Sequence, residues 1–173
     1  PTVTARDRAH VNTALNRWLD SPSKEPVVVL VYASGTSSNL LDDLTTATST
    51  LLGKKPTIVR GADSSERASI HETFEKALSG GSLSTIGLKE LEKLSWDAPL
   101  VLHAFVDADY AVVDSRPLIW LQVTRDDSLR GMPCDQAMER TLTSSWIASG
   151  GKDDNVAPII SRILQFIVCL DWE

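Results

Sequence analysis

The sequence predicts an α/β fold: a three-layer, mostly parallel sheet of five strands with helices on both faces. Short apolar runs rich in branched residues are typical of strands buried on both faces, and they recur along the chain. Longer stretches with apolar residues at helical spacing separate these runs. Strands that alternate with helices are joined by right-handed crossovers, which give a parallel sheet.

The first half of the chain alternates between the two patterns. Apolar residues on one stripe predict a helix over 5–19, and the β-branched run 27–32 is too short for a helix. A second helix, 39–53, ends at a glycine followed by a proline. The run 57–60 predicts a second, shorter strand, and a serine cap predicts a helix over 64–78.

The second half continues the alternation. A short helix is expected at 87–94, followed by a third strand at 99–105 that makes His103 a strand residue. A fourth strand is expected at 118–124, and apolar residues at helical spacing predict a helix over 134–149.

Near the end of the chain a short helix precedes an apolar run, and Arg162 is the only formal charge between Asp154 and Asp171. Residues 153–155 offer N-cap side chains, and Pro158 is tolerable in a first turn. The run 163–170 is typical of a fifth strand, covered on both faces and central in the sheet. Arg162 therefore lies at a helix C-terminus, where the helix dipole favours a cation, so a plain dipole-pairing role is one interpretation.

Length, charge and hydropathy limit the function classes. With 173 residues we expect one domain, 1–173, in which 1–22 form an N-terminal helix and linker and 23–173 the core. A net charge of −6 without a basic cluster argues against nucleic acid and anionic membrane as partners. No apolar run approaches the roughly 20 residues that span a bilayer. We expect an excised domain whose targeting segments, and any membrane anchor, are absent from this chain.

The loop after the first strand lacks the parts of a phosphate loop. Such a loop needs glycines that let backbone N–H groups approach phosphates, and a lysine that neutralises them. Residues 33–39 contain one glycine and no lysine, and Lys54 and Lys55 follow the next helix. Tight Mg·ATP binding and catalytic ATP use are therefore disfavoured.

Other candidate groups have plainer explanations. Asp107 and Asp109 follow the expected third strand, where an acidic pair would hold Mg²⁺, but helix capping is the favoured interpretation. The serines of the first loop, Ser34, Ser37 and Ser38, would need a later histidine to act as nucleophiles, and none follows His103.

The cysteines and histidines do not define a metal or redox site. No Cys/His pair has zinc-ligand spacing. A bridge between Cys134 and Cys169 is possible, but spacing alone does not decide whether it forms. Among the described motifs, then, none supplies a cofactor site of the protein's own.

The order and spacing of several segments carry a family resemblance. These segments are the strand and loop 25–33, Val-Arg-Gly-Ala-Asp at 59–63, the run 99–111, and the helix from Asp154-Asn155 to Ser161-Arg162-Ile163. Together, over 11–170, the sequence resembles the luminal domains of the torsin activators of the nuclear envelope and endoplasmic reticulum. These are lamina-associated polypeptide one and its luminal-domain-like paralogue.

The resemblance implies a AAA+-like large domain without nucleotide-binding motifs or lid domain. It implies a non-catalytic regulatory subunit that binds an ATP-loaded torsin ATPase in a heteromeric, alternating assembly. Arg162 then occupies the position of the arginine finger, while the partner holds ATP and Mg²⁺. Asn155 and Ile159, on the same helix, are candidates for partner contacts, with helix-cap and core roles as alternatives. The implied location is the lumen of the endoplasmic reticulum and the perinuclear space, with a membrane anchor outside this chain.

Two departures and two alternatives stay open at this point. The cysteines that form a disulfide in the first core helix of familiar members have no counterpart between Asn39 and Gly53, and no Asn-x-Ser/Thr glycosylation acceptor occurs. One alternative function is a degenerate P-loop-like nucleotide-binding enzyme or sensor that uses 34–39. The other is an adaptor that binds something else entirely.

Overall fold

A single parallel sheet forms the middle layer of the protein. A computed structural model describes residues 3–35, 39–63, 66–107 and 113–172. The strands lie in the order β2-β3-β4-β1-β5, and every neighbouring pair is parallel. Their bounds are β1 Val27–Ala33, β2 Ile58–Arg60, β3 Leu83–Lys89, β4 Arg116–Thr124 and β5 Phe166–Cys169. The predicted five-stranded α/β fold is confirmed.

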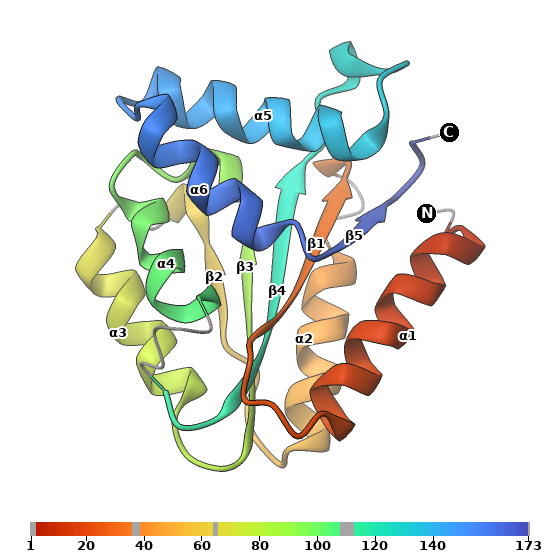
Figure 1. Cartoon of the computed structure of the whole chain (residues 1–173), viewed down its shortest axis with the longest axis vertical. Helices are drawn as coiled ribbons and strands as arrows, with labels where there is room; N and C mark the ends of the chain where they lie inside the picture. Colours follow the sequence, from red (N-terminus) through yellow and green to blue (C-terminus); the bar gives the residue numbers. More distant parts are fainter. Residues whose placement is uncertain (1–2, 36–38, 64–65, 108–112, 173) are drawn as a thin grey trace.

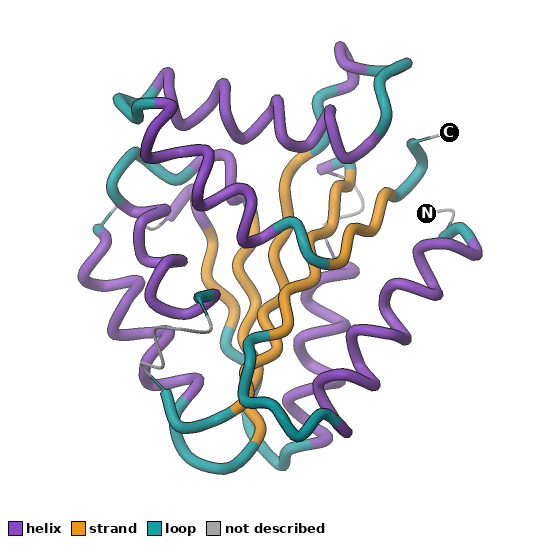
Figure 2. Tube along the Cα trace, viewed as in Figure 1, coloured by secondary structure: helices purple, strands orange, loops and turns teal. Residues whose placement is uncertain are grey.

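Helices cover both faces of this sheet (Figures 1 and 2). One face packs on α1 Ala5–Asp20 and α2 Asn39–Leu51. The other packs on α3 Arg67–Leu78, α4 Val101–Val106, α5 Cys134–Ala148 and α6 Asp153–Ile163. Alternate residues of each central strand enter the two apolar clusters, which accounts for the unbroken apolar runs of β1 and β4.

The third strand lies earlier in the chain than the sequence predicts. Residues 99–105 are not a strand: Ala98–Leu100 form a 3-10 turn and α4 follows, so His103 is helical. Residues 87–94 are not a helix either, because β3 runs to Lys89 and a 3-10 turn follows at Leu91–Lys93. A short run that is apolar on every side suits a buried helix as well as a buried strand, and here it is the helix.

The polar residues of β3 explain why its strand pattern is weak. Thr85 hydrogen-bonds Thr48 of α2 through their hydroxyls at 3.2 Å. Gly87 lies against α2, and a Cβ at this position would come within 2.6 Å of the Thr45 hydroxyl and 2.9 Å of Leu41. The close approach of α2 therefore requires small side chains where a typical buried strand carries branched ones.

The end of the chain also differs from the prediction. α6 begins at Asp153, so Pro158 lies inside the helix rather than in its first turn, and the ladder lacks one backbone donor there. Ile163 still belongs to α6, and β5 has four residues at the edge of the sheet, not its centre.

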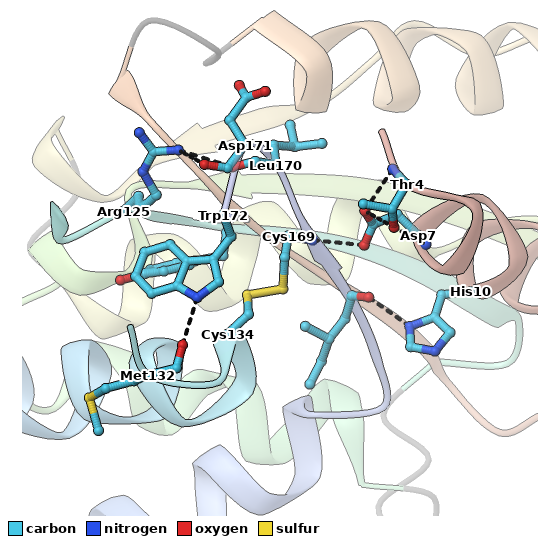
Figure 3. The surroundings of a disulfide bond; sticks show 12 residues. Thr4, Asp7, His10, Arg125, Met132, Cys134, Cys169, Leu170, Asp171 and Trp172 are labelled. Carbon is cyan, nitrogen blue, oxygen red and sulfur yellow. Dashed lines mark hydrogen bonds between the residues drawn. A yellow bond between two sulfur atoms is a disulfide. The ribbon is translucent and has the colours of Figure 1, made fainter. Parts of the chain in front are cut away.

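A disulfide and two side chains of α1 hold this edge strand (Figure 3). Cys134, the first residue of α5, is bonded to Cys169 at the end of β5, so the bridge left open by the spacing is present. On the outer edge of β5, the Cys169 N–H donates to Asp7 at 3.0 Å, and His10 Nδ1 lies 2.7 Å from the Ile167 carbonyl oxygen. α1 thus satisfies backbone groups that an edge strand would otherwise expose.

Candidate functional site

Arg162 lies in the last turn of α6, with its guanidinium at the surface. Its side chain is 40% exposed. Nε donates to Asp107 Oδ2 at 2.9 Å, and Nη1 donates to the Pro158 carbonyl oxygen, one turn earlier, at 3.0 Å. Nη2 has no hydrogen-bond partner among the described residues. Two bonds therefore hold the guanidinium at Nε and Nη1, while the N–H groups of Nη2 stay available among the described residues.

Asp107 comes from a different element, the C-terminal end of α4. It is the C-cap of this helix, and its side chain is 19% exposed. A carboxylate at a helix C-terminus faces the negative end of the dipole, so it needs a compensating cation. Arg162 supplies that charge, and the C-terminal ends of α4 and α6 meet through this pair. Asp107 was expected to cap the start of a helix that follows a strand; it lies instead at the C-cap position of α4, so that interpretation is wrong, and Asp109 lies outside the described residues.

His103 belongs to the same corner, one turn before Asp107 on α4. Burial, and next the positive charge of Arg162, lower the pKa of His103 below its ordinary range. The imidazole is therefore neutral at pH 7. Asp107 and Arg162 are then the charged members of this group.

The two candidates for partner contacts on α6 are placed differently. Asn155 is exposed and lies seven residues before Arg162, roughly 10 Å along the same side of the helix. Ile159 is completely buried in the apolar cluster beneath α6. Ile159 is a core residue, and this corrects its assignment as a surface contact.

At the carboxyl end of β1, the described part of the first loop offers no phosphate cradle. A Cβ added at Gly35 would meet nothing within 4 Å, so no close backbone approach requires glycine there. Lys54 lies at the other end of the strands, before the start of β2, where its Nζ donates to the Gly80 carbonyl oxygen at 2.6 Å. Ser37 and Ser38, like the candidate caps Ser64 and Ser65, lie outside the described residues.

A lysine ends the third strand, where a nucleotide-binding site would need an acid. Lys89 is the last residue of β3, is 8% exposed, and donates from Nζ to Asp42 in the first turn of α2 at 2.8 Å. The ammonium therefore occupies the space between β3 and the start of α2, on the side where Mg²⁺ would bind. Asp107 does not follow the third strand, because 99–105 is not a strand and β3 ends at Lys89.

The next residue, Glu90, also forms hydrogen bonds with side chains of the protein itself. Its Oε1 accepts hydrogen bonds from Lys93 at 2.8 Å and Arg60 at 3.3 Å. The bond from Lys93 in particular holds the pKa of Glu90 below its ordinary value. A carboxylate bound in this way is a weak base, which does not suit the activation of water.

Replacing Lys89 by methionine tests the ion pair between Lys89 and Asp42. The variant keeps the apolar stem but removes the ammonium, and leaves Asp42 without its cation. We expect the free energy of unfolding to fall by about 1–3 kcal/mol, the cost of a poorly partnered polar group. Urea unfolding measures it. Lys24→Met, which removes an exposed lysine paired with exposed Asp114, should change stability by less than about 0.5 kcal/mol; equal losses in both variants would contradict the role of Lys89.

Neither a metal cluster nor a membrane span is found in the described ranges. No three His, Cys, Asp or Glu side chains gather there in a way that could hold a metal ion. No helix among the described residues has the length and apolar character needed to cross a bilayer.

Comparisons with known proteins bear on the fold. No family model matches the chain, and no curated protein matches its sequence. The structure is similar to a variant of RuvB from Thermotoga maritima, with a TM-score of 0.59, 12% identity, and coverage of 98% of this chain and 46% of that one. It is also similar to S. cerevisiae Hsp104 in a casein complex, with a TM-score of 0.56, 14% identity, and coverage of 93% and 32%.

These similarities concern the architecture alone. The chain spans less than half the length of either neighbour, and the sequence identities are low. The five-stranded, all-parallel sheet with helices on both faces is similar in architecture to these neighbours. The protein therefore has a AAA+-like α/β fold.

Proposed function

We propose that this domain is a non-catalytic regulatory subunit that binds an ATP-loaded torsin ATPase and stimulates its ATP hydrolysis through Arg162. The observation that carries the proposal is the guanidinium itself: 40% exposed, at the end of α6, with its outer N–H groups unpartnered among the described residues. The resemblance of the segments around it to the torsin activators names the partner.

The chemistry of phosphoryl transfer explains how such an arginine acts. In a loose transition state, negative charge spreads over the equatorial oxygens of the transferred γ-phosphoryl group. A planar, permanently charged guanidinium from a neighbouring subunit stabilises this charge, and such fingers raise rates by roughly 10³ to 10⁵. Asn155, exposed on the same side of α6, would lie at the rim of this contact.

The groups at the carboxyl ends of β1 and β3 support a role in which this domain binds no nucleotide itself. Lys89 and Asp42 neutralise one another where Mg²⁺ would be needed, and the described part of the loop after β1 brings no lysine. ATP and Mg²⁺ then belong to the partner, in a heteromeric assembly that involves no nucleic acid.

The disulfide supports the proposed compartment. Stable disulfides form and persist in oxidising environments such as the lumen of the endoplasmic reticulum. The bond between Cys134 and Cys169 suits that lumen and the perinuclear space continuous with it.

The rival function, a degenerate nucleotide-binding enzyme or sensor, makes the opposite prediction for the isolated domain. A ligand that binds the native state raises its melting temperature. We expect millimolar Mg·ATP to shift the melting temperature by no more than about 1 °C relative to Mg²⁺ at matched ionic strength, because Lys89 is engaged by Asp42. A shift of several degrees would favour the rival.

A further inference from the structure

We propose that Asp107 is a positioning residue, which holds the Arg162 guanidinium in the orientation that it needs to act on a neighbouring subunit's triphosphate. This inference rests on the proposed function and adds a second residue to it, from another helix. Its basis is the bond from Arg162 Nε to Asp107 Oδ2 at 2.9 Å.

Two nitrogen atoms of the guanidinium, Nε and Nη1, are hydrogen-bonded, and Nη2 has no hydrogen-bond partner among the described residues. Asp107 takes Nε, and the Pro158 carbonyl oxygen takes Nη1, so acceptors from two directions restrict rotation of the long side chain. The same carbonyl oxygen also accepts from the Ser161 hydroxyl at 2.9 Å. A side chain held by two bonds loses less entropy when it meets phosphate than one that moves freely.

The placement of Asp107 is costly unless its partner is present. Asp107 occupies the C-cap position of α4, where the helix dipole disfavours negative charge. Arg162 has a favourable position at the end of α6 even without an acid. Arg162 offsets this unfavourable placement, and the bond between the two side chains orients the guanidinium.

The pair also leaves the arginine accessible. The Arg162 side chain is 40% exposed and the Asp107 side chain 19% exposed, so the arginine stays the more accessible member of the pair. His103, on the turn before Asp107, is neutral at pH 7 because burial and the Arg162 charge lower its pKa. Asp107 thus provides the acceptor that faces Nε at this corner.

Stimulation of a torsin ATPase by substituted forms of the domain tests the proposal. Asp107→Ala should lower the maximal stimulated rate at least about tenfold, because a shift near 1 Å costs that much or more. Its half-saturating concentration should stay within about twofold of the unsubstituted domain. Asp107→Asn keeps an oxygen acceptor and should retain stimulation within about threefold. Asp114→Ala, which removes an exposed aspartate paired with Lys24 and not with Arg162, is the matched control and should behave as the unsubstituted domain.

Arg162→Ala separates failure of this inference from failure of the proposed function. Normal stimulation by Asp107→Ala, together with none by Arg162→Ala, would overturn the positioning role alone. Full stimulation by Arg162→Ala would overturn the proposed function itself. A raised half-saturating concentration at an unchanged maximal rate would also contradict the inference, because it would make Asp107 a binding contact. If Asp107→Ala fails to fold, Asp107→Asn and Asp107→Glu decide: the longer Glu should displace the guanidinium and lower the maximal rate more than Asn.

Discussion

Replacing Arg162 by alanine should abolish the stimulation of torsin ATP hydrolysis, a loss of about 10³-fold or more if the finger acts as in other phosphoryl-transfer enzymes. The reason is electrostatic: the variant loses a planar cation whose Nη2 donors have no partner among the described residues. The domain should still fold, because a half-exposed ion pair contributes about 1 kcal/mol at most. Phosphate release at saturating domain measures the effect.

Two further variants make this result specific. Arg162→Lys keeps the charge but loses the fork that serves Asp107, Pro158 and the phosphate together, so it should recover only a small part of the stimulation. Arg60→Ala removes another exposed arginine, paired with Glu90 and Asp63, and should leave stimulation unchanged. If all three variants stimulated equally well, Arg162 would have only the dipole-pairing role.

Removing the disulfide should produce the largest loss of stability. The bond closes a loop over a sequence separation of 35, for which the chain-entropy model gives about 3–4 kcal/mol. It also fastens β5, which pairs in the sheet with β1, to the start of α5 (Figure 3). The Cys134→Ser, Cys169→Ser double variant should therefore melt roughly 10 °C lower than the unsubstituted domain.

A reducing agent provides the matched control for that prediction. Reductant should lower the melting temperature of the unsubstituted domain toward that of the double variant, and should not change the melting temperature of the double variant. If the unsubstituted domain without reductant and the double variant had the same melting temperature, the stabilising role of the disulfide would be contradicted.

The strands with strong apolar patterns could be predicted from sequence, and β3 could not. β1 and β4 lie in the middle of the sheet, face apolar clusters on both sides, and consist largely of branched residues. β3 is equally buried, but α2 packs so closely on it that Thr85 and Gly87 interrupt the pattern. The apolar run at 99–105 was predicted to be the third strand in its place, although it folds as part of a 3-10 turn followed by α4.

The site was predictable to a different extent. Arg162 stands out in the sequence because apolar residues surround it, and its place at the end of α6 is confirmed. Its partner Asp107 lies 55 residues away, and only the packing of α4 against α6 brings the two together. The role of Lys89 could not be predicted from the sequence because β3 was not predicted, and that role depends on the position of Lys89 at the carboxyl end of β3. Ile159 was misassigned because helical spacing alone does not tell which side of α6 faces the core.

Phosphate release by an ATP-loaded torsin, titrated with the purified domain, tests the central proposal most directly. The account predicts a saturable rise in the rate, with no phosphate released by the domain alone. If a complex formed between the two proteins but the rate stayed at its basal value across the titration, the proposal that this domain provides a positive charge to another subunit's ATP would be wrong.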